Sequence, residues 1–308
     1  MRDISFEHYK VFYYVAKSGN ITAAAHELFL SQPSVSRSVA SLEEQLNCKL
    51  FVRSKKGVEL TPEGEQLYKH IRIACTHIFS AEEELSLMKQ ETAGVLRLAV
   101  SDAAFQQRII SRISEFHTNF PSVHLKIDNM STPETLEAVH SNVVDMAIVT
   151  TPYVTPYDLS SIELCELSDI AVAGPAFSHL KDKQLSLAEL GGYTLITLEE
   201  GSTTRRFFDK LFRQHGLLID PDIELASISQ VLPLVRSGLG IGFVPEAIAE
   251  EDIRLGKIFE IKLREKIPSR SVCLVTDAEY EVNDIMTAFT DTLTGKPVTV
   301  RSEQEEKQ

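Results

Sequence analysis

Residues 22–46 constrain the fold of this chain more than any other stretch, because they predict two short helices joined by a tight turn. Small side chains at Ala24 and Ala25 allow the close backbone approach that two steeply crossed helices need. We expect Thr22 to cap the first of these helices and Ser31 to cap the second. An apolar stripe at helical spacing predicts one more helix before them: Phe6, Tyr9, Phe12, Tyr13 and Ala16.

The second helix of the pair is expected to bury one narrow apolar stripe: Val35, Val39, Leu42 and Leu46. Glu43 and Glu44 lie in its C-terminal half, where they would repel phosphates, so the N-terminal half is expected to meet DNA. There Arg37 suits a guanine edge and Gln32 suits an adenine edge. The predicted DNA contacts on this helix are Ser31, Gln32, Pro33, Ser34, Ser36 and Arg37. The alternative is an ordinary surface helix whose serines face solvent.

A basic hairpin is predicted directly after this helix. Residues 50–53 and 58–60 read as two short strands, with a glycine that permits a tight turn between them. Arg53, Lys55 and Lys56 place three positive charges on the hairpin, where they are expected to lie along the phosphate backbone of DNA. The alternative is a basic loop that faces only solvent.

This order of elements resembles the LysR-type transcriptional regulators. The residues that carry the resemblance are Phe6 through Val15, Ala24-Ala25, Leu28, Ser31 through Arg37, Leu42-Glu43, Leu46, Leu50 through Arg53 and Leu60 through Gly64. The resemblance implies a backbone contact from Arg53. It implies base contacts near Gln32, Pro33, Ser36 and Arg37. Phe29 departs from the family pattern, which often has a small residue at this corner, and we expect it to pack locally.

Composition narrows the class of protein. The 308 residues are enough for two or three domains. No run approaches the roughly 18 apolar residues that a membrane span needs, and the N-terminus lacks the apolar segment of a signal peptide, so we expect a cytoplasmic protein. Four scattered cysteines and nine histidines show neither C-x-x-C nor H-E-x-x-H spacing. We therefore expect no metal site and no cofactor.

The net charge of −13 is distributed unevenly along the chain. Residues 1–60 contain eight basic and six acidic residues, whereas residues 93–308 contain twenty basic and thirty-two acidic residues. Because attraction to phosphate is screened over about 10 Å, the acidic part does not prevent the N-terminal part from binding DNA. The N-terminal part is only weakly basic, so we expect it to bind repeated half-sites as an oligomer.

A long helix is predicted to start at Thr61-Pro62. Its apolar residues follow steps of four and three: Leu67, Ile71, Ala74, Ile78, Ala81, Leu85 and Met88. Such a heptad pattern predicts a dimer seam, for which we select Leu67, Ile71, Ile78 and Leu85. The alternative is a helix that lies on its own domain. The family resemblance implies pairing of two subunits and thus a dyad-symmetric DNA site.

After Gly94 the chain alternates between apolar strands and helices, which predicts βαβ units and a largely parallel sheet. One strand is expected at residues 226–228, and a late strand at 272–275 is expected to return to the first half, with crossovers near residues 165 and 267. The predicted fold is α/β and multidomain, with a winged helix-turn-helix, a linker helix and a two-lobed effector-binding domain; the resemblance implies similarity to periplasmic binding proteins. The predicted divisions are residues 1–61 (DNA binding), 62–92 (linker), 93–165 with 267–300 (first lobe), 166–266 (second lobe) and 301–308 (polar tail).

Polar residues at strand ends and helix starts predict a ligand cleft, because ligands of such folds bind outside the carboxyl ends of the strands. The predicted effector contacts are Ser101, Asp102, Thr132, Thr150, Ser202, Thr203 and Arg205. Hydroxyl and N–H groups at helix starts suit a small anion such as a carboxylate. Asp102 is an unfavourable neighbour for an anion, and Arg205 is expected to offset it or to bind the ligand. In the alternative, Thr132 and Ser202 are only helix N-caps.

These features predict a transcription regulator that is not an enzyme. It would bind double-stranded DNA at a dyad-symmetric operator as a dimer or a homotetramer, under the control of a small anionic effector. RNA polymerase is an expected further partner, and a membrane is not. Two other classes stay open: an enzyme with a DNA anchor, for which we find no nucleophile elbow or metal cluster, and an architectural DNA protein with an inert C-terminal region.

Overall fold

The computed structural model describes residues 4–54, 57–88, 94–105, 107–279 and 282–295. The chain divides into two compact units, residues 1–90 and residues 91–308. None of the helices in these ranges is long and apolar enough to cross a membrane.

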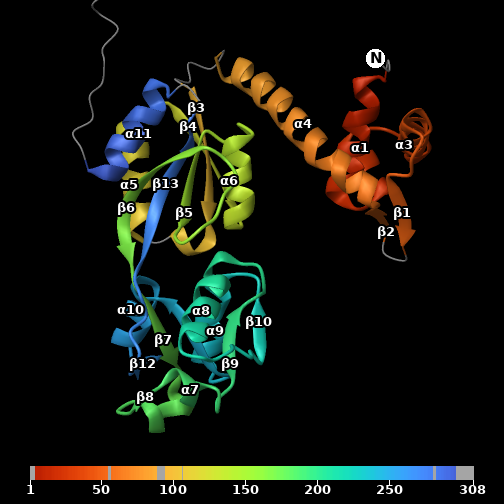
Figure 1. The fold of residues 1–308 in the computed structure, drawn as a ribbon. Coiled ribbons are helices and arrows are strands. Elements are labelled where there is room, and N and C mark those ends of the chain that lie inside the picture. The colour runs from red at the N-terminus through yellow and green to blue at the C-terminus, as the bar shows by residue number, and fades with distance from the viewer. Residues whose placement is uncertain (1–3, 55–56, 89–93, 106, 280–281, 296–308) are drawn as a thin grey trace, which may run out of the picture. The chain divides into compact units, whose positions relative to one another are not determined.

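The first unit is a winged helix-turn-helix followed by a long helix (Figure 1). Its elements are α1 (Phe6–Ser18), α2 (Ile21–Glu27), α3 (Gln32–Leu46), β1 (Phe51–Ser54), β2 (Gly57–Leu60) and α4 (Pro62–Met88). Strands β1 and β2 are antiparallel and pair Ser54 with Gly57. Helix α4 contacts α1 and β2, so this long helix begins against the helix-turn-helix core.

Local sequence signals place most of these helix ends. The Ser31 side chain accepts a hydrogen bond from the Ser34 amide and Pro33 lies in the first turn of α3, as predicted. The prediction for α2 was wrong by two residues: Asn20, and not Thr22, is its N-cap, and it accepts bonds from the amides of Thr22 and Ala23. Asparagine is as good a cap as threonine, so either residue fits the sequence pattern.

The predicted apolar faces of α2 and α3 form the core of the first unit, but the stripe predicted for α1 was wrong in part, because Phe6 is 41% exposed and Tyr9, Tyr13 and Ala16 are only half-buried. The buried side chains include Val11, Phe12, Val15, Ala24, Ala25, Val35, Val39, Leu42 and Leu50. Leu46 is half-buried and packs at the edge of this core. The alanines of α2 leave room for α1 and α3 to cross closely.

Glu43 is a structural residue and not the surface charge that its position in the sequence indicated. It is 8% exposed, and its Oε1 accepts hydrogen bonds from the amides of Leu50 and Phe51 at 2.9 and 3.3 Å. Its Oε2 lies 2.6 Å from Lys49 Nζ. Burial alone would raise the pKa of Glu43, but the bonds from Lys49 and the two amides outweigh it and lower that pKa. The carboxylate therefore ties α3 to the start of the hairpin.

The second unit contains two sheets, each with helices on both faces, which we call the first and second lobes. The first lobe is a five-stranded sheet in the order β4-β3-β5-β13-β6. Its strands are β3 (Gly94–Ser101), β4 (Val123–Met130), β5 (Met146–Thr150), β6 (Leu159–Leu167) and β13 (Arg270–Asp277). Its helices are the short η1 (Asp102–Ala104), α5 (Gln107–Asn119), α6 (Thr132–His140) and α11 (Asp284–Thr294). One face packs on α5 and α11 and the other on α6 (Figure 1).

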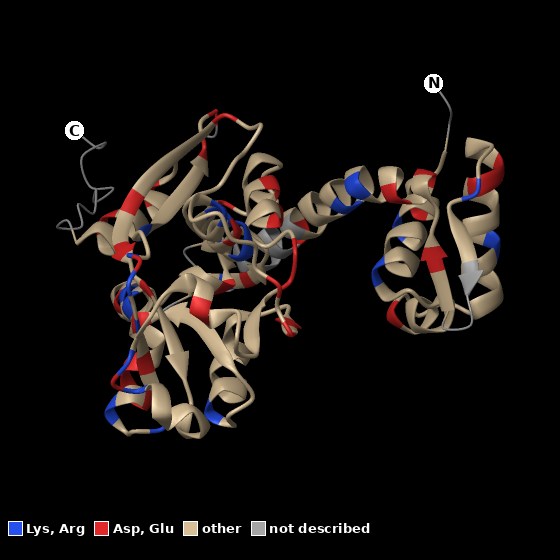
Figure 2. Cartoon of the chain, turned by 60° about the horizontal axis from the view of Figure 1, so that its bottom comes forward, with Lys and Arg blue, Asp and Glu red and all other residues tan. Residues whose placement is uncertain are grey.

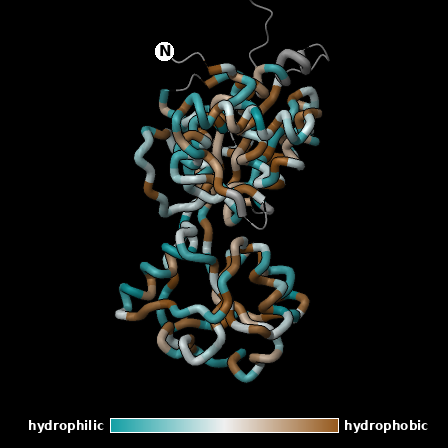
Figure 3. Tube along the Cα trace, turned by 90° about the vertical axis from the view of Figure 1, so that its right-hand side faces the viewer, coloured by the Kyte–Doolittle hydropathy of each residue, from teal (hydrophilic) through white to brown (hydrophobic). Residues whose placement is uncertain are grey.

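The second lobe is a six-stranded sheet in the order β10-β9-β11-β7-β12-β8. Its strands are β7 (Asp169–Ala173), β8 (Gln184–Leu185), β9 (Leu195–Leu198), β10 (Ile223–Leu225), β11 (Ile241–Pro245) and β12 (Phe259–Leu263). Its helices are η2 (Pro175–Leu180), α7 (Leu187–Leu190), α8 (Thr203–Gln214), η3 (Ile228–Gln230), α9 (Val231–Arg236) and α10 (Glu246–Arg254). Hydrophobic segments gather toward the middle of this lobe (Figure 3).

Two details of the predicted sheet were wrong. Both sheets are mixed and not largely parallel, because β13 runs antiparallel to β5 and β6, and β7 runs antiparallel to β11 and β12. Residues 226–228 are not a strand: β10 ends at Leu225, and Ile228 starts a short 3-10 helix. The expected return of residues 272–275 to the first sheet is confirmed, since β13 pairs with β5 and β6.

The chain passes between the two sheets at residues 167–169 and again at residues 263–270. A buried ion pair joins these two passages. Arg270 Nε and Nη2 donate to the two carboxylate oxygens of Asp169 at 2.7 and 2.9 Å, and both side chains are fully buried. Arg270 Nη1 also donates to Thr204 Oγ1 at 3.2 Å. The pair fixes the point at which the two lobes meet.

Replacement of the buried carboxylate, Glu43→Ala, is expected to destabilise the first unit by about 2–3 kcal/mol, because it leaves the buried Leu50 amide without its acceptor. The exposed neighbour Glu44→Ala is the matched control and should change stability by less than about 0.5 kcal/mol. The measurement is urea denaturation of the full chain, read by hydrogen exchange in residues 1–60. Equal effects of the two variants would contradict the role of Glu43.

The same carboxylate predicts a pH dependence. A pKa lowered by folding adds stability that is complete above the ordinary pKa of a glutamate and is lost as the pH falls through the lower folded-state value. The stability difference between wild type and Glu43→Ala should therefore shrink as the pH falls below about 4.

Candidate functional site

The N-terminal half of α3 presents the polar face that the sequence predicted. Gln32, Pro33 and Arg37 are exposed, and Ser34 and Ser36 are half-buried. The predicted inward residues of the same helix are buried, so the polar face points away from the core. The arrangement leaves the exposed helix start free to enter a DNA groove.

Arg37 is held along the helix surface. Its Nε donates to the Pro33 carbonyl at 3.3 Å and its Nη2 to Ser34 Oγ at 3.5 Å. Ser31 Oγ and Ser34 Oγ lie 2.9 Å apart. These long, exposed bonds are weak, so the guanidinium is directed by its neighbours but can exchange them for a stronger acceptor.

The hairpin is fixed to the helix-turn-helix by its backbone. The Val58 amide donates to the Gly19 carbonyl at 3.0 Å, and a side chain at Gly57, with φ of +144°, would collide with that same carbonyl oxygen. Glycine is therefore required at the turn. Arg53 lies in β1, although its side chain is not described, and Lys55 and Lys56 lie outside the described residues.

Phe29 does not pack locally, contrary to the sequence expectation. It occupies the corner between α2 and α3 with a φ of 54°, and its side chain is 95% exposed. The left-handed backbone at this corner directs the ring away from the core.

Two predicted seam residues have partners inside their own chain. Leu67 and Ile71 pack against the cluster of Phe12, Leu42 and Leu50. Ile78 lies about two turns further along α4 than Ile71, and its side chain is 39% exposed. The side chain of Leu85 lies outside the description. The first part of the heptad thus stabilises the first unit, and Ile78 is the predicted seam residue whose exposed side chain suits contact with another subunit.

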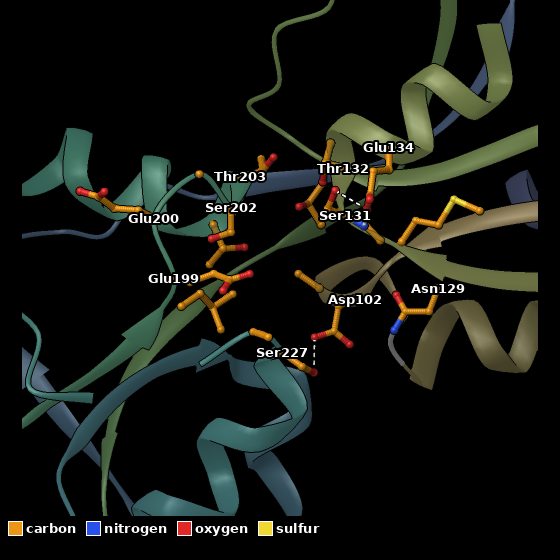
Figure 4. A pocket seen from close by; sticks show the side chains of 18 residues that line it. Asp102, Asn129, Ser131, Thr132, Glu134, Glu199, Glu200, Ser202, Thr203 and Ser227 are labelled. Carbon is orange, nitrogen blue, oxygen red and sulfur yellow. Dashed lines mark hydrogen bonds between the residues drawn. The ribbon is translucent and has the colours of Figure 1, made fainter. Parts of the chain in front are cut away.

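A cavity of about 500 Å³ opens between the two lobes at the carboxyl ends of strands β3, β4, β5 and β9. Six of the seven predicted effector residues line it: Ser101, Asp102, Thr132, Thr150, Ser202 and Thr203. They come from both lobes, and Figure 4 shows four of them, Asp102, Thr132, Ser202 and Thr203, around the opening. The topology therefore brings together residues that are up to about a hundred positions apart in the sequence.

Arg205 is the exception. It does not line the cavity, because its guanidinium is buried and donates to Asp209 Oδ1 at 2.9 Å and to Glu224 Oε1 at 2.6 Å. Burial would lower the pKa of Arg205, but these two carboxylates raise it. The side chain is therefore charged and forms ion pairs inside the second lobe. It is not available to offset the charge of Asp102.

Two helix N-termini face the cavity. Ser202 caps α8, because its Oγ accepts from the Arg205 amide at 3.1 Å. At α6 the N-cap is Ser131, whose amide and hydroxyl both donate to Glu134 Oε2, so Thr132 is the first helical residue and not the cap. Since the first N–H groups of a helix have no partner within the helix, both ends can bind an acceptor in the cavity.

Asp102 connects the lobes across the cavity. Its Oδ2 accepts hydrogen bonds from Ser227 Oγ at 2.7 Å and from the Ile228 amide at 2.6 Å (Figure 4). Sequence reasoning missed Ser227, because the position had been assigned to a strand. Asp102 follows a strand and Ser227 precedes a short helix, and nothing in the sequence indicates that these two residues form a hydrogen bond with each other.

Sequence reasoning also missed most of the acidic lining. Glu134, Glu199 and Glu200 line the cavity together with Asp102, and so do the uncharged Asn129 and Ser131. Within the described part of the chain, no lysine, arginine or histidine does so. Over the whole second unit, by contrast, basic and acidic residues are interspersed (Figure 2). No group of three or more His, Cys, Asp or Glu residues suited to a metal ion occurs among the described residues.

The four cysteines are free thiols. Burial raises the pKa of Cys75, Cys165 and Cys273, so these three groups are protonated at neutral pH. A reactive cysteine needs the opposite shift, toward the thiolate.

Comparison with known proteins gives one consistent result. A sequence model described as "Bacterial regulatory helix-turn-helix protein, lysR family" matches residues 6–65, and one described as "LysR substrate binding domain" matches residues 89–296. The RuBisCO operon transcriptional regulator of Allochromatium vinosum is 29% identical over 87% of each chain.

Two solved structures share the fold. The crystal structure of CbnR, a LysR family transcriptional regulator, has a TM-score of 0.71 at 19% identity and covers 94% of this chain and 98% of its own. The regulatory domain of CcmR from Synechocystis PCC6803, solved in complex with 2-PG, has a TM-score of 0.60 at 21% identity and covers 66% of this chain and 96% of its own.

The bond between the lobes gives a direct prediction. Asp102→Ala removes the acceptor of the Ile228 amide, which should then exchange with solvent at least about tenfold faster in native-state hydrogen exchange. Glu200→Ala is the control, because Glu200 lines the same cavity but points away from Asp102 (Figure 4). Unchanged protection of Ile228 in the Asp102 variant would show that the lobes are held together without this contact.

Proposed function

The chain belongs to the LysR family of bacterial transcription regulators, and from that premise we propose how its own residues bind DNA and an effector. It is a DNA-binding transcription regulator with an effector-binding domain, and the relatives that it matches are named as transcriptional regulators and not as enzymes. The observation that carries the proposal is the polar cavity between the lobes, lined by six of the residues that the strand ends predicted.

We propose that α3 enters the major groove by its N-terminal half. Arg37 and Gln32 are exposed there and have the donor patterns that suit guanine and adenine edges. Ser31, Ser34 and Ser36 supply shorter hydroxyl contacts to bases or phosphates, and Pro33 packs against the groove. The hairpin residues Arg53, Lys55 and Lys56 are proposed to contact phosphates.

The protein is proposed to act as a dimer or tetramer on a dyad-symmetric operator. Residues 1–60 have a net charge of only +2, so one copy attracts DNA weakly, and two linked copies would bind far more tightly. The exposed Ile78 on α4 supports a seam on that helix. The solved complex of full-length CbnR with its target DNA shows that a protein of this fold binds DNA. A role in the cytoplasm and contact with RNA polymerase follow from this proposal.

The effector is proposed to lie between the lobes with an anionic group at the two helix starts. Thr132 and Thr203 begin α6 and α8, and both line the cavity with buried side chains. Hydroxyls and unpaired amides at such positions bind carboxylate or phosphate oxygens. A ligand that bridges the lobes stabilises one arrangement of the pair and thereby changes how the protein meets its operator.

The test is a footprint of the full chain on the DNA upstream of its own gene, with and without a small-molecule extract of the source cells. Arg37→Ala should remove protection at one base position and cost about 1–3 kcal/mol, whereas Lys55→Ala should weaken binding to all sequences and reduce its salt dependence. Identical effects of both variants would contradict these roles. A footprint that no extract changes would contradict effector control.

The seam is tested by Ile78→Glu, which places a charge on the exposed part of α4 without disturbing the core that Leu67 and Ile71 join. We expect the variant to sediment as a monomer while its helix content is unchanged. His77→Glu on the same exposed turn is the control and should keep the wild-type mass. If Ile78→Glu keeps the wild-type mass, the subunits pair elsewhere.

A further inference from the structure

We propose that the effector is a zwitterion, a small molecule that carries an ammonium group as well as a carboxylate, as a free α-amino acid does. The proposal rests on the function proposed above and names the class of ligand for the same cavity. It is carried by two observations: the charge of the cavity walls and one buried hydroxyl without a partner.

Carboxylates from both lobes form the walls of the cavity. Asp102 stands at the end of β3 in the first lobe, and Glu199 follows β9 in the second lobe. Figure 4 shows these two side chains on facing walls, with Glu200 turned away from them. Glu134 shares the wall of the first lobe, but its Oε2 is occupied by Ser131.

These carboxylates have no basic counterpart in the cavity. Among the described lining residues there is no lysine, arginine or histidine. Two buried arginines are engaged elsewhere: Arg205 is bound by Asp209 and Glu224, and Arg270 is bound by Asp169. The exposed Arg206 donates to Thr203 Oγ1 at 3.4 Å but is not itself among the lining residues. A purely anionic ligand would meet uncompensated negative charge at close range, which is unfavourable in a partly enclosed site. An ammonium group between Asp102 and Glu199 turns that repulsion into attraction.

The Ser101 hydroxyl supplies the second observation. Ser101 lines the cavity and is 3% exposed, yet its Oγ has no hydrogen-bond partner among the residues that the structure describes. A buried hydroxyl without a partner costs free energy, and such groups are rare in native proteins unless a ligand or a water satisfies them. Ser101 directly precedes Asp102, so one ligand can receive a hydrogen bond from the hydroxyl and an ion pair from the carboxylate.

One end of the cavity thus suits a carboxylate and the other end suits an ammonium group. The starts of α6 and α8, with Thr132 and Thr203, offer hydroxyl and amide donors to a carboxylate. Glu199 and Asp102 offer acceptors to an ammonium group; at Asp102 the acceptor is Oδ1, since Oδ2 accepts from Ser227 and Ile228. A volume of about 500 Å³ lies within the range of small-molecule sites. A compact molecule with both charges satisfies both ends, whereas a simple acid or a simple amine satisfies only one.

The test is calorimetry of the full chain with three matched series: the common L-amino acids, their analogues without the amino group, and their decarboxylated amines. At least one amino acid should bind, and both of its truncated analogues should bind at least about tenfold more weakly, because each loses a charge-assisted contact. A simple acid that binds as tightly as its amino acid would overturn the proposal, as would binding by no member of the three series.

Matched variants locate the ammonium group. Glu199→Gln keeps the size of an exposed side chain and removes its charge, and should weaken binding of the amino acid about tenfold while strengthening binding of its deaminated analogue, which the charge repels. Glu200→Gln removes an equal charge from the neighbouring residue, whose side chain points away from Asp102, and should change the binding of either ligand by much less than Glu199→Gln does. Equal effects of the two variants on the amino acid would overturn the assignment. If the footprint responds to cell extract while the series fails to bind, only the zwitterion is refuted; if no extract changes the footprint, the proposed function itself fails.

Discussion

The buried pair of Arg270 and Asp169 is the interaction on which the two-lobed domain depends. Both residues lie at the start of a strand that follows a passage between the sheets, so their bidentate contact clamps the two crossing segments to each other. Loss of either partner would leave an uncompensated buried charge, which typically costs about 3–5 kcal/mol. Arg270 also donates to Thr204 and stacks over Phe207, both in α8, so the clamp positions one helix start at the cavity.

A fixed clamp and a weaker contact across the opening make the cavity responsive to a ligand. The Arg270 clamp is fully buried, whereas the bonds from Ser227 and Ile228 to Asp102 lie at the partly exposed cavity wall. Water competes with the second contact more readily than with the first. Under the proposed function, a ligand that binds Asp102 would replace the more exposed of the two contacts, and it would shift the lobes toward the arrangement that it prefers.

The fold was largely predictable wherever the signal was local. Periodicity placed the faces of α3, a serine followed by Pro33 placed its start, and strand ends with hydroxyls placed six residues at one cavity. The failures share a physical cause. Glu43 looked like a surface charge and Arg205 like a ligand contact, but the fold supplies internal partners 4 to 19 positions away, including Asp209, the Leu50 amide and Glu224. A choice between caps of equal strength, as between Asn20 and Thr22, likewise needs the folded backbone to decide it.

The charge of the cavity shows the limit of sequence reasoning most clearly. The acidity of residues 93–308 is evident from composition, yet composition does not say which acids face one another. Helix starts can be recognised one at a time, so the donors for a carboxylate were predicted. The charge of the cavity is a sum over acidic residues from three segments, and it lacks a contribution from Arg205 and Arg270, whose charges are neutralised by carboxylates inside the domain. The ligand preference that we propose for this domain thus depends on which cations are engaged inside the lobes as much as on which side chains line the cavity.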